Sequence, residues 1–169
     1  MLHCNKCMIS RHQNLWFHYV EAWNGKFFKR YDLVSIGFVI SLGHNGARCQ
    51  HIRPSVEPSN LVIGHTNGIH NCKLHYCNCP SAPDKVTQLL RARIWPATRD
   101  SSQSAFTLAV LRTWHQLWLN AKISTHHFMN AMARYTDNAF PADVKVSSTQ
   151  LLCCHVQLCN RTALANFAS

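Results

Sequence analysis

LVIGHTNGIHNCKLHYCNCPSAPDKVTQLLRARIWPATR, residues 61–99, joins a predicted β-hairpin to a pair of cysteines and a basic, aromatic segment. Asn67-Gly68 is a strong hairpin signal, because both residues readily adopt the positive φ angles of a tight turn. The second strand leads to Cys77 and Cys79, and if it stays extended both sulfurs lie on one face. We therefore expect a small antiparallel sheet that carries a Cys-x-Cys metal site.

Further zinc-ligand residues accompany this hairpin. A structural zinc ion takes four Cys or His ligands in a tetrahedron. We expect Cys77 and Cys79 to share one ion with Cys49 and a histidine. Alternation along the strand places His70 on the face opposite Cys77. This favours His44 as the fourth ligand unless the strand bends, and His70 stays a candidate. The alternative is that these thiols are buried as small apolar side chains.

A second cluster lies near the N-terminus, with the spacing Cys4-x2-Cys7-x4-His12-x5-His18. A tight turn can direct two thiols at this spacing toward one ion, and the histidines supply two nitrogens. The interval between the pairs is shorter than in a two-Cys, two-His finger, so half of a cross-braced zinc module is predicted. The alternative is two surface histidines and two incidental cysteines. Residues 1–18 are short and polar, so we expect any structure there to need the metal.

The charge balance favours a polyanionic partner. The chain has 17 Lys and Arg against 7 Asp and Glu, a formal net charge of +10, and each neutralised phosphate releases condensed counterions. Arginines flank Trp95, a combination that suits phosphate contact and base stacking. DNA binding is therefore predicted, unless Trp95 belongs to the core and the arginines to a solvated face. The candidate contacts are Arg91, Arg93, Trp95 and Arg99.

The chain has nine cysteines and twelve histidines, and whether the cysteines form disulfides or bind metal depends on the cellular compartment. The first residues, MLHCNKCMISRHQ (1–13), lack a charged segment followed by an apolar one, which a secretory signal would show. No run approaches the ~18 apolar residues of a membrane span. We expect an intracellular chain without a membrane partner, whose reduced thiols bind metal instead of forming disulfides.

The carboxylates argue against catalysis. A catalytic zinc keeps an open position and commonly has an Asp or Glu nearby as a base. None of the carboxylates falls in a His-Glu-x-x-His or His-x-Glu frame. We expect no enzymatic activity and no small-molecule substrate. The carboxylate residues are Glu21, Asp32, Glu57, Asp84, Asp100, Asp137 and Asp143.

The second half of the chain is predicted to be helical. Apolar residues recur at three- and four-residue steps over 104–121, which indicates one helix. Ser124 or Thr125 caps a second helix that ends at Asp137. Residues 144–169 lose the pattern and are predicted to be a divergent, poorly ordered tail. The fold class is α+β: a short zinc-bound N-terminal module, a small antiparallel sheet with the Cys-x-Cys zinc site, then two or more packed helices.

Five blocks, in this order and at compatible spacing, resemble one known family. They are WNGKFFKRYDLVSIGFVISLGH (23–44), NGIHNCKLHYCNC (67–79), QLLRARIWPAT (88–98), SAFTLAVLRTWHQLWLNAK (104–122) and ARYTDNA (133–139). The chain is similar over roughly 4–140 to the CxC type 2 cysteine-cluster domain, found N-terminal to the catalytic region of KDZ transposases, chiefly in fungi. The resemblance implies a cysteine-cluster domain over 1–143 that chelates zinc, associates with DNA in the nucleus and accompanies a KDZ-type transposase.

The resemblance also implies a set of zinc ligands, and the chain departs from the family pattern in three ways. Family members usually carry further Cys pairs before the one matched here, which implies half of a cross-brace at 1–18. His65, Cys72 and His75 stand where non-ligand residues are expected. No block resembles the transposase catalytic region, so the chain is not expected to transpose DNA by itself. Two alternatives stay open: a protein-interaction module with purely structural zinc, and a decayed transposon gene fragment without activity. The implied zinc ligands are Cys4, Cys7, His12, His18, His44, Cys49, His70, Cys77 and Cys79.

Overall fold

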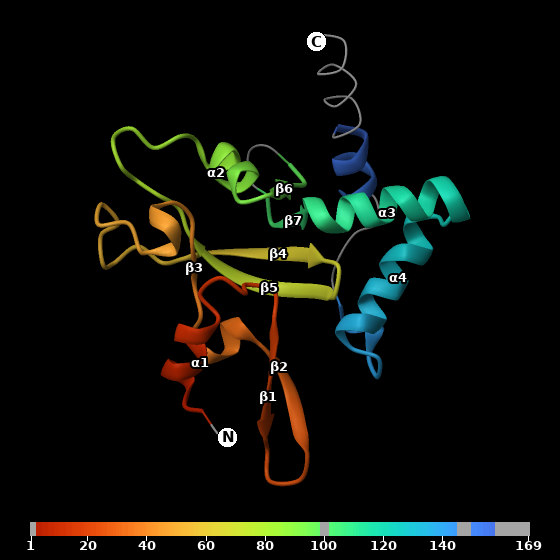
Figure 1. Cartoon of the computed structure of the whole chain (residues 1–169), viewed down its shortest axis with the longest axis horizontal. Coiled ribbons are helices and arrows are strands. Elements are labelled where there is room, and N and C mark those ends of the chain that lie inside the picture. Colours follow the sequence, from red (N-terminus) through yellow and green to blue (C-terminus); the bar gives the residue numbers. More distant parts are fainter. Residues whose placement is uncertain (1–2, 99–101, 145–149, 158–169) are drawn as a thin grey trace. The chain divides into compact units, whose positions relative to one another are not determined.

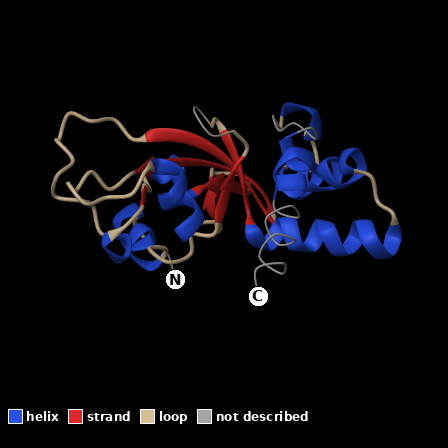
Figure 2. Cartoon of the chain, turned by 90° about the horizontal axis from the view of Figure 1, so that it is seen from above, coloured by secondary structure: helices blue, strands red, loops and turns tan. Residues whose placement is uncertain are grey.

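The computed structural model describes residues 3–98, 102–144 and 150–157, which form an α+β fold (Figures 1 and 2). The helices are α1 (Asn5–Arg11), α2 (Lys85–Arg91), α3 (Leu108–Ala121) and α4 (Thr125–Thr136), and residues 150–157 are also helical. The strands are β1 (Tyr19–Trp23), β2 (Phe28–Asp32), β3 (Ile40–Ser41), β4 (Ser59–His65), β5 (Gly68–His75), β6 (Ile94–Pro96) and β7 (Ser104–Thr107). Short 3-10 helices are η1 (Leu33–Ile36), η2 (His44–Gly46) and η3 (Pro141–Asp143).

The strands form two sheets. β1 and β2 pair antiparallel, and the other five strands follow the order β3-β5-β4-β7-β6. Within the larger sheet, β6 pairs with β7 antiparallel, whereas β3–β5 and β4–β7 are parallel pairs. The predicted α+β class is confirmed, and the sheet that leads to the cysteine pair holds parallel pairs besides the antiparallel ones that the hairpin signal indicated.

The chain divides into two compact units. Unit 1 comprises residues 1–61 and 70–88, and unit 2 comprises residues 62–69 and 89–169. The first unit contains the β1–β2 hairpin, β3, most of β5 and residues 85–88 of α2. The second contains β6, β7, α3 and α4. Each unit has its own set of buried apolar side chains.

Unit 1 has little strand over 32–44, although the β-branched residues of this segment are typical of strands. Residues Leu33–Ile36 form the 3-10 helix η1, and β3 is only two residues long. Gly37 follows η1 with φ +90°, a left-handed conformation that ends the helix and interrupts any extended run. The β-branched residues pack in a short, irregular segment, with Leu33 and Ile40 at 3% and 2% exposure.

Unit 2 differs from the prediction at Ser104. The predicted helix over 104–121 begins only at Leu108, because Ser104–Thr107 form β7. All four residues of β7 are buried, which fits a strand covered on both faces. Thr107 then caps α3, since its side-chain oxygen accepts a hydrogen bond from the Val110 N–H. Helical periodicity alone cannot separate this short buried strand from the helix after it.

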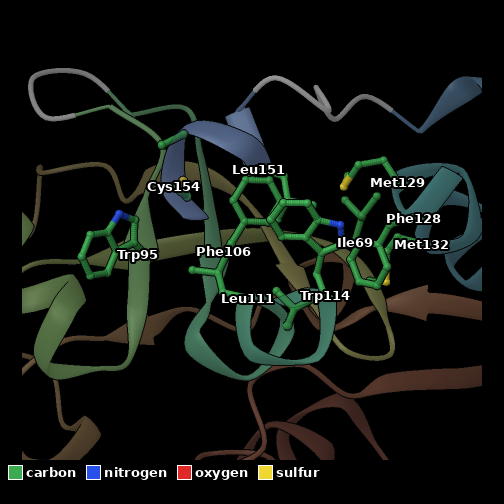
Figure 3. Packing of buried hydrophobic residues seen from close by; sticks show 12 residues of the cluster. Ile69, Trp95, Phe106, Leu111, Trp114, Phe128, Met129, Met132, Leu151 and Cys154 are labelled. Carbon is green, nitrogen blue, oxygen red and sulfur yellow. The ribbon is translucent and has the colours of Figure 1, made fainter. Parts of the chain in front are cut away.

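The core of unit 2 is an apolar cluster to which α3, α4 and residues 150–157 contribute (Figure 3). Trp114 of α3 is 1% exposed, and Leu151 and Cys154 are both fully buried. Residues 150–157 were predicted to lie in a poorly ordered tail. For 150–157 the structure differs from this prediction, because their apolar face packs into the cluster, and residues 145–149 and 158–169 of the predicted tail lie outside the described residues. Ser124 caps α4 and the helix ends before Asp137, as predicted. Among the described residues, no helix has the length and apolar character needed to cross a membrane.

Candidate metal centre

Parallel strand pairing in unit 1 brings the chemistry-bearing residues together. Ser41, the last residue of β3, pairs with His75, the last residue of β5. Parallel strands end at the same edge of a sheet. The Leu42 N–H extends the pairing by donating a hydrogen bond to the His75 carbonyl at 2.8 Å. His44 and Cys77 follow within a few residues, so the chain delivers both to one place.

Four ligand atoms meet at this edge. The Nε2 of His44 lies 3.3 Å from the Sγ of Cys77 and 3.4 Å from the Sγ of Cys79. The Sγ of Cys49 lies 3.7 Å from that of Cys79 and 3.8 Å from that of Cys77. All four ligand atoms are within 4.8 Å of one another. We call this group the metal centre.

These separations fit a tetrahedral zinc ion. With Zn–S bonds of about 2.3 Å and Zn–N bonds of about 2.05 Å, tetrahedral edges are about 3.8 Å between sulfurs and about 3.6 Å between sulfur and nitrogen. The two S–S separations that involve Cys49 lie within about 0.1 Å of that edge, and the two S–N separations are slightly shorter than theirs. They are far longer than the ~2.05 Å of a disulfide bond, and all three cysteines are free thiols. The donor set therefore fits zinc in both chemistry and size.

A left-handed backbone turn presents His44 to the centre. Gly43 has φ +88°, and the next two residues, His44 and Asn45, have φ +46° and +52°. A Cβ at Gly43 would lie 3.2 Å from the Cβ of Cys77. Glycine therefore meets two needs here, since it allows the positive φ and leaves room for the cysteine.

Gln88 of α2 holds the other side of the metal centre in place. Its side chain is 7% exposed. The Cys77 N–H donates to Gln88 Oε1 at 2.7 Å, and Gln88 Nε2 donates to the Cys77 carbonyl at 3.0 Å and the Pro83 carbonyl at 2.9 Å. These bonds fix the loop that carries two of the thiols. Sequence reasoning missed Gln88, because Asp84 signals a helix start but not which helical residue faces the cysteines.

The electrostatics of the centre favour a cation. The backbone N–H of Asn78 is the main cause that lowers the pKa of Cys49, to about 6. Hydrogen bonding with Cys77 is the main cause that raises the pKa of Cys79, to about 12, and the charge of Cys49 adds to it. Without a cation, ionisation of the Cys49 thiol therefore disfavours ionisation of the Cys79 thiol. A bound metal ion removes this conflict, because thiolates are its ligands.

His70 lies outside the metal centre, which corrects its prediction as a ligand. It is 2% exposed, and its ring stacks on Tyr19 with centroids 4.3 Å apart. Its Nδ1 lies 3.8 Å from the Asp32 carboxylate. Alternation along β5 explains the outcome, since His70 shares its buried face with Cys72. Cys77 lies beyond the end of the strand, so the expected extension through the cysteine pair is also corrected.

The N-terminal candidates lie in two pairs. The sulfurs of Cys4 and Cys7 are 3.4 Å apart at the start of α1. The rings of His12 and His18 are 5.6 Å apart, and His12 Nδ1 lies 2.8 Å from the Met8 carbonyl. Within 3–98, 102–144 and 150–157, the metal centre is the only group of three or more Cys, His, Asp or Glu ligand atoms close enough to share one ion. The pairs are therefore not assembled into a four-ligand site.

Only two of the four candidate nucleic-acid contacts lie exposed in the described part of the chain. Arg91 and Arg93 are exposed. Trp95 is 8% exposed and its indole N–H donates to Gln157 Oε1 at 3.3 Å, so base stacking by this ring is corrected to a core role. Arg99 lies outside the described residues.

Comparison with known proteins gives one match. Residues 33–140 match the family described as CxC2 like cysteine cluster associated with KDZ transposases. This range contains the whole metal centre, while the N-terminal pairs lie outside it. No curated protein and no solved structure matches the chain. Because the match spans more than half of its length, the chain belongs to the CxC2 like cysteine cluster family associated with KDZ transposases.

Proposed function

We propose that the chain is a non-catalytic zinc-binding module that acts in the nucleus with a KDZ-type transposase and contributes contacts to DNA. The observation that supports the zinc part is the metal centre, where four separations among one nitrogen and three sulfurs, 3.3 to 3.8 Å, match the edge lengths expected for a zinc tetrahedron. The family association supports the transposase part, and the net charge of +10 supports the DNA part.

The donor set favours zinc in a structural role. Thiolate and imidazole ligands select zinc over magnesium and calcium, which prefer oxygen. Four protein ligands close the coordination sphere, whereas a catalytic zinc keeps an open position for water or substrate. The ion would join the residues after β3, the segment around Cys49 and the loop after β5. Residues 47–58 between them have no helix or strand, so the ion would cross-link a segment that lacks regular structure.

Elemental analysis of the chain, purified without added metal, tests the zinc part. We expect one equivalent of zinc, lost in Cys77→Ser and kept in Cys4→Ser. Near two equivalents would show that the N-terminal pairs also bind an ion. A folded protein without zinc would reject the proposal, and an unfolded protein without zinc would favour a decayed gene fragment.

Binding to a labelled DNA duplex tests the DNA part. We expect affinity to fall steeply between about 50 mM and about 200 mM salt, because phosphate contacts release counterions. Absence of binding at low salt would remove duplex DNA from the proposal and leave the zinc result untouched.

One observation favours a protein-interaction module as the second candidate. Unit 2 has an apolar hollow of about 620 Å³, with Leu117 of α3 and Phe128 and Tyr135 of α4 in its lining. Apolar hollows of this kind accept partner side chains. This candidate predicts zinc content without measurable DNA affinity, so the same two measurements separate it from the first.

A further inference from the structure

We propose that the turn of the β1–β2 hairpin is a nucleic-acid contact, with aromatic rings that stack on unpaired bases and cations that bind the neighbouring phosphates. The inference rests on the proposed DNA association and assigns it to a segment, residues 23–30, which we call the hairpin tip. The sequence analysis placed the candidate contacts at Arg91, Arg93, Trp95 and Arg99 instead.

Three aromatic side chains of the hairpin tip face solvent. Trp23 is 57% exposed, Phe27 56% and Phe28 60%. Trp23 and Phe28 are direct cross-strand partners, and their ring centroids are 5.3 Å apart at an interplanar angle of 60°. Clustered exposed apolar residues mark interaction surfaces, because water contact at such a patch is unfavourable. In the described part of the chain, the other strongly exposed aromatic rings are Trp118, Tyr135 and Phe140, and none of them directly neighbours another in sequence.

Exposed cations accompany these rings in the sequence of the hairpin. The hairpin tip carries Lys26, Lys29 and Arg30, all exposed, and no acidic residue. The Arg30 guanidinium lies 3.5 Å from the Tyr19 ring centroid, and the Lys29 ammonium lies 5.5 Å from the Tyr31 ring centroid. Glu21, opposite Arg30 in the register, and Asp32 are the acidic residues nearest in sequence. The combination of aromatic rings with an excess of positive charge is the one that single-stranded nucleic acid requires.

The turn holds the rings in a fixed arrangement. The Asn24 side-chain oxygen accepts hydrogen bonds from the N–H groups of Lys26 at 3.0 Å and Phe27 at 2.9 Å. The Asn24 N–H donates to the Phe27 carbonyl at 3.1 Å. Gly25 has φ +96°, which this turn needs and glycine supplies without strain. A pre-ordered turn loses little entropy on binding, which strengthens any contact that its side chains make.

The side-chain chemistry selects unpaired bases over duplex. A two-stranded β-ribbon can enter the major groove of duplex DNA, but readout there uses polar side chains that hydrogen-bond to base edges. The hairpin tip presents aromatic faces instead, and every unpaired base offers a π-face for them to stack on. The net charge of +10 makes a polyanion the complementary partner. The tip therefore fits a single strand or an opened duplex end.

The test measures binding of the full, zinc-loaded chain to a labelled oligothymidine and to a duplex of equal length. We expect tighter binding to the single strand. The double variant Trp23→Ser/Phe28→Ser should weaken that binding by about tenfold or more, the effect of losing one or two stacked bases. Lys26→Gln/Lys29→Gln should lower the salt dependence, with a slope change of about 0.7 for each lost phosphate contact.

Matched controls and outcomes separate the two proposals. Phe140→Ser removes a ring that is 66% exposed in unit 2, and Arg112→Gln removes an exposed cation of α3, so both should bind as the unmodified chain does. Zinc content should stay unchanged in all variants.

If the tip variants bind the single strand as tightly as the unmodified chain, or if the unmodified chain prefers the duplex, the inference about the hairpin tip is overturned and the proposed DNA role remains. No nucleic-acid binding by the unmodified chain would overturn the proposed DNA role as well. Binding to anionic lipid vesicles that is lost in the tip variants, with DNA binding unaffected, would assign the tip to membranes instead.

Discussion

Cys72 and Cys77 are five residues apart, yet their surroundings give their thiols different roles. Cys72 is 7% exposed on the buried face of β5, and burial raises its pKa to about 12. It remains a neutral thiol that packs as a small apolar side chain. Cys77 lies after the strand, where its sulfur meets His44 and two other thiols. Position relative to the strand end therefore separates the ligand from the core residue.

The first prediction compares two cysteine variants. Cys79→Ser should lower zinc affinity by more than about 100-fold, since even residues that only support a ligand contribute about 10- to 100-fold. Cys72→Ser should keep its zinc and lose only stability, because it places a hydroxyl in an apolar site. Competition with a chromophoric chelator measures both affinities. Equal zinc affinity in the two variants would contradict the assignment.

Histidines provide the second prediction. His70→Ala should reduce the free energy of unfolding by about 2–4 kcal/mol, because it leaves a cavity beside Tyr19, but the zinc stoichiometry should stay the same. His44→Ala should instead weaken zinc binding with little loss of apolar packing, since His44 is exposed. Denaturant titration and elemental analysis of both variants check this. Zinc loss in His70→Ala would restore His70 as a ligand.

The sequence was enough to predict all four ligands of the metal centre, but not the residues that hold these ligands in place. Cys-x-Cys spacing and strand alternation were enough to favour His44 over His70. Gln88 and Gly43 could not be predicted, because their roles depend on which loops meet at the edge of the sheet. Trp95 was ambiguous for the same reason: an aromatic residue beside arginines suits a binding face or a core, and only its 8% exposure decides.

At the level of elements, the helical residues 150–157 show how the core of unit 2 is completed. Leu151 and Cys154 are fully buried, while Leu152 is 44% exposed. On the same helix, His155 Nε2 lies 2.6 Å from His115 Nδ1 of α3, and the Trp114 ring meets the His155 ring edge-on at 4.4 Å. The segment therefore adds both apolar and polar contacts to α3.

The third prediction tests this packing with neighbouring leucines. Leu151→Ala should lower the free energy of unfolding by about 3 kcal/mol, the usual cost of a buried cavity. Leu152→Ala should change it by less than about 0.5 kcal/mol, because that side chain is largely exposed. Thermal and denaturant unfolding compare the pair. Equal effects would mean that the segment does not pack as described.

The fourth prediction concerns pH. Burial, with the nearby His115, lowers the pKa of His155 below its ordinary value of 6.5. The unfolded chain therefore binds more protons than the folded chain below that pH, so stability falls as the pH drops from 6.5 through the folded pKa. His155→Gln should lose less stability than the unmodified chain between about pH 7 and about pH 5. An unchanged pH dependence would contradict a buried, neutral His155.

Element boundaries show which sequence signals were sufficient. The cap and turn residues were sufficient: Ser124 begins α4, and Asn67 marks the hairpin of β4 and β5. Apolar runs without such signals did not. Residues 104–107 are apolar or small, so their strand merged with the periodicity of α3 in the prediction. The helical residues 150–157 were missed because their short apolar face is recognisable only against its partners.

At the level of the whole molecule, the proposed zinc ion would affect the stability of the two units differently. Unit 2 has a large apolar cluster of helices and strands, with Trp114, Phe106 and Leu111 at 1% exposure or less. Unit 1 has the metal centre and long segments without regular structure, such as residues 47–58. A structural zinc ion contributes about 10 kcal/mol or more to folding in small modules, which is comparable to the whole stability of a domain. Zinc should therefore determine the stability of unit 1 far more than that of unit 2.

The fifth prediction follows from this difference. Chelation of zinc should speed hydrogen exchange at amides around the metal centre, including the N–H groups of Leu42, Ala47 and Cys77, whose hydrogen bonds lie in or beside the ligand loops. Amides in the middle of α3 should keep their protection, because the apolar cluster that covers them contains no ligand. Mass spectrometry of hydrogen exchange with and without a chelator measures both sets of amides.

Cys79→Ser serves as the control, because it lacks a complete metal site and a chelator should change its hydrogen exchange little. Loss of protection in both units together would show that the apolar core of unit 2 depends on the metal, and unchanged protection in both would show that zinc does not hold unit 1.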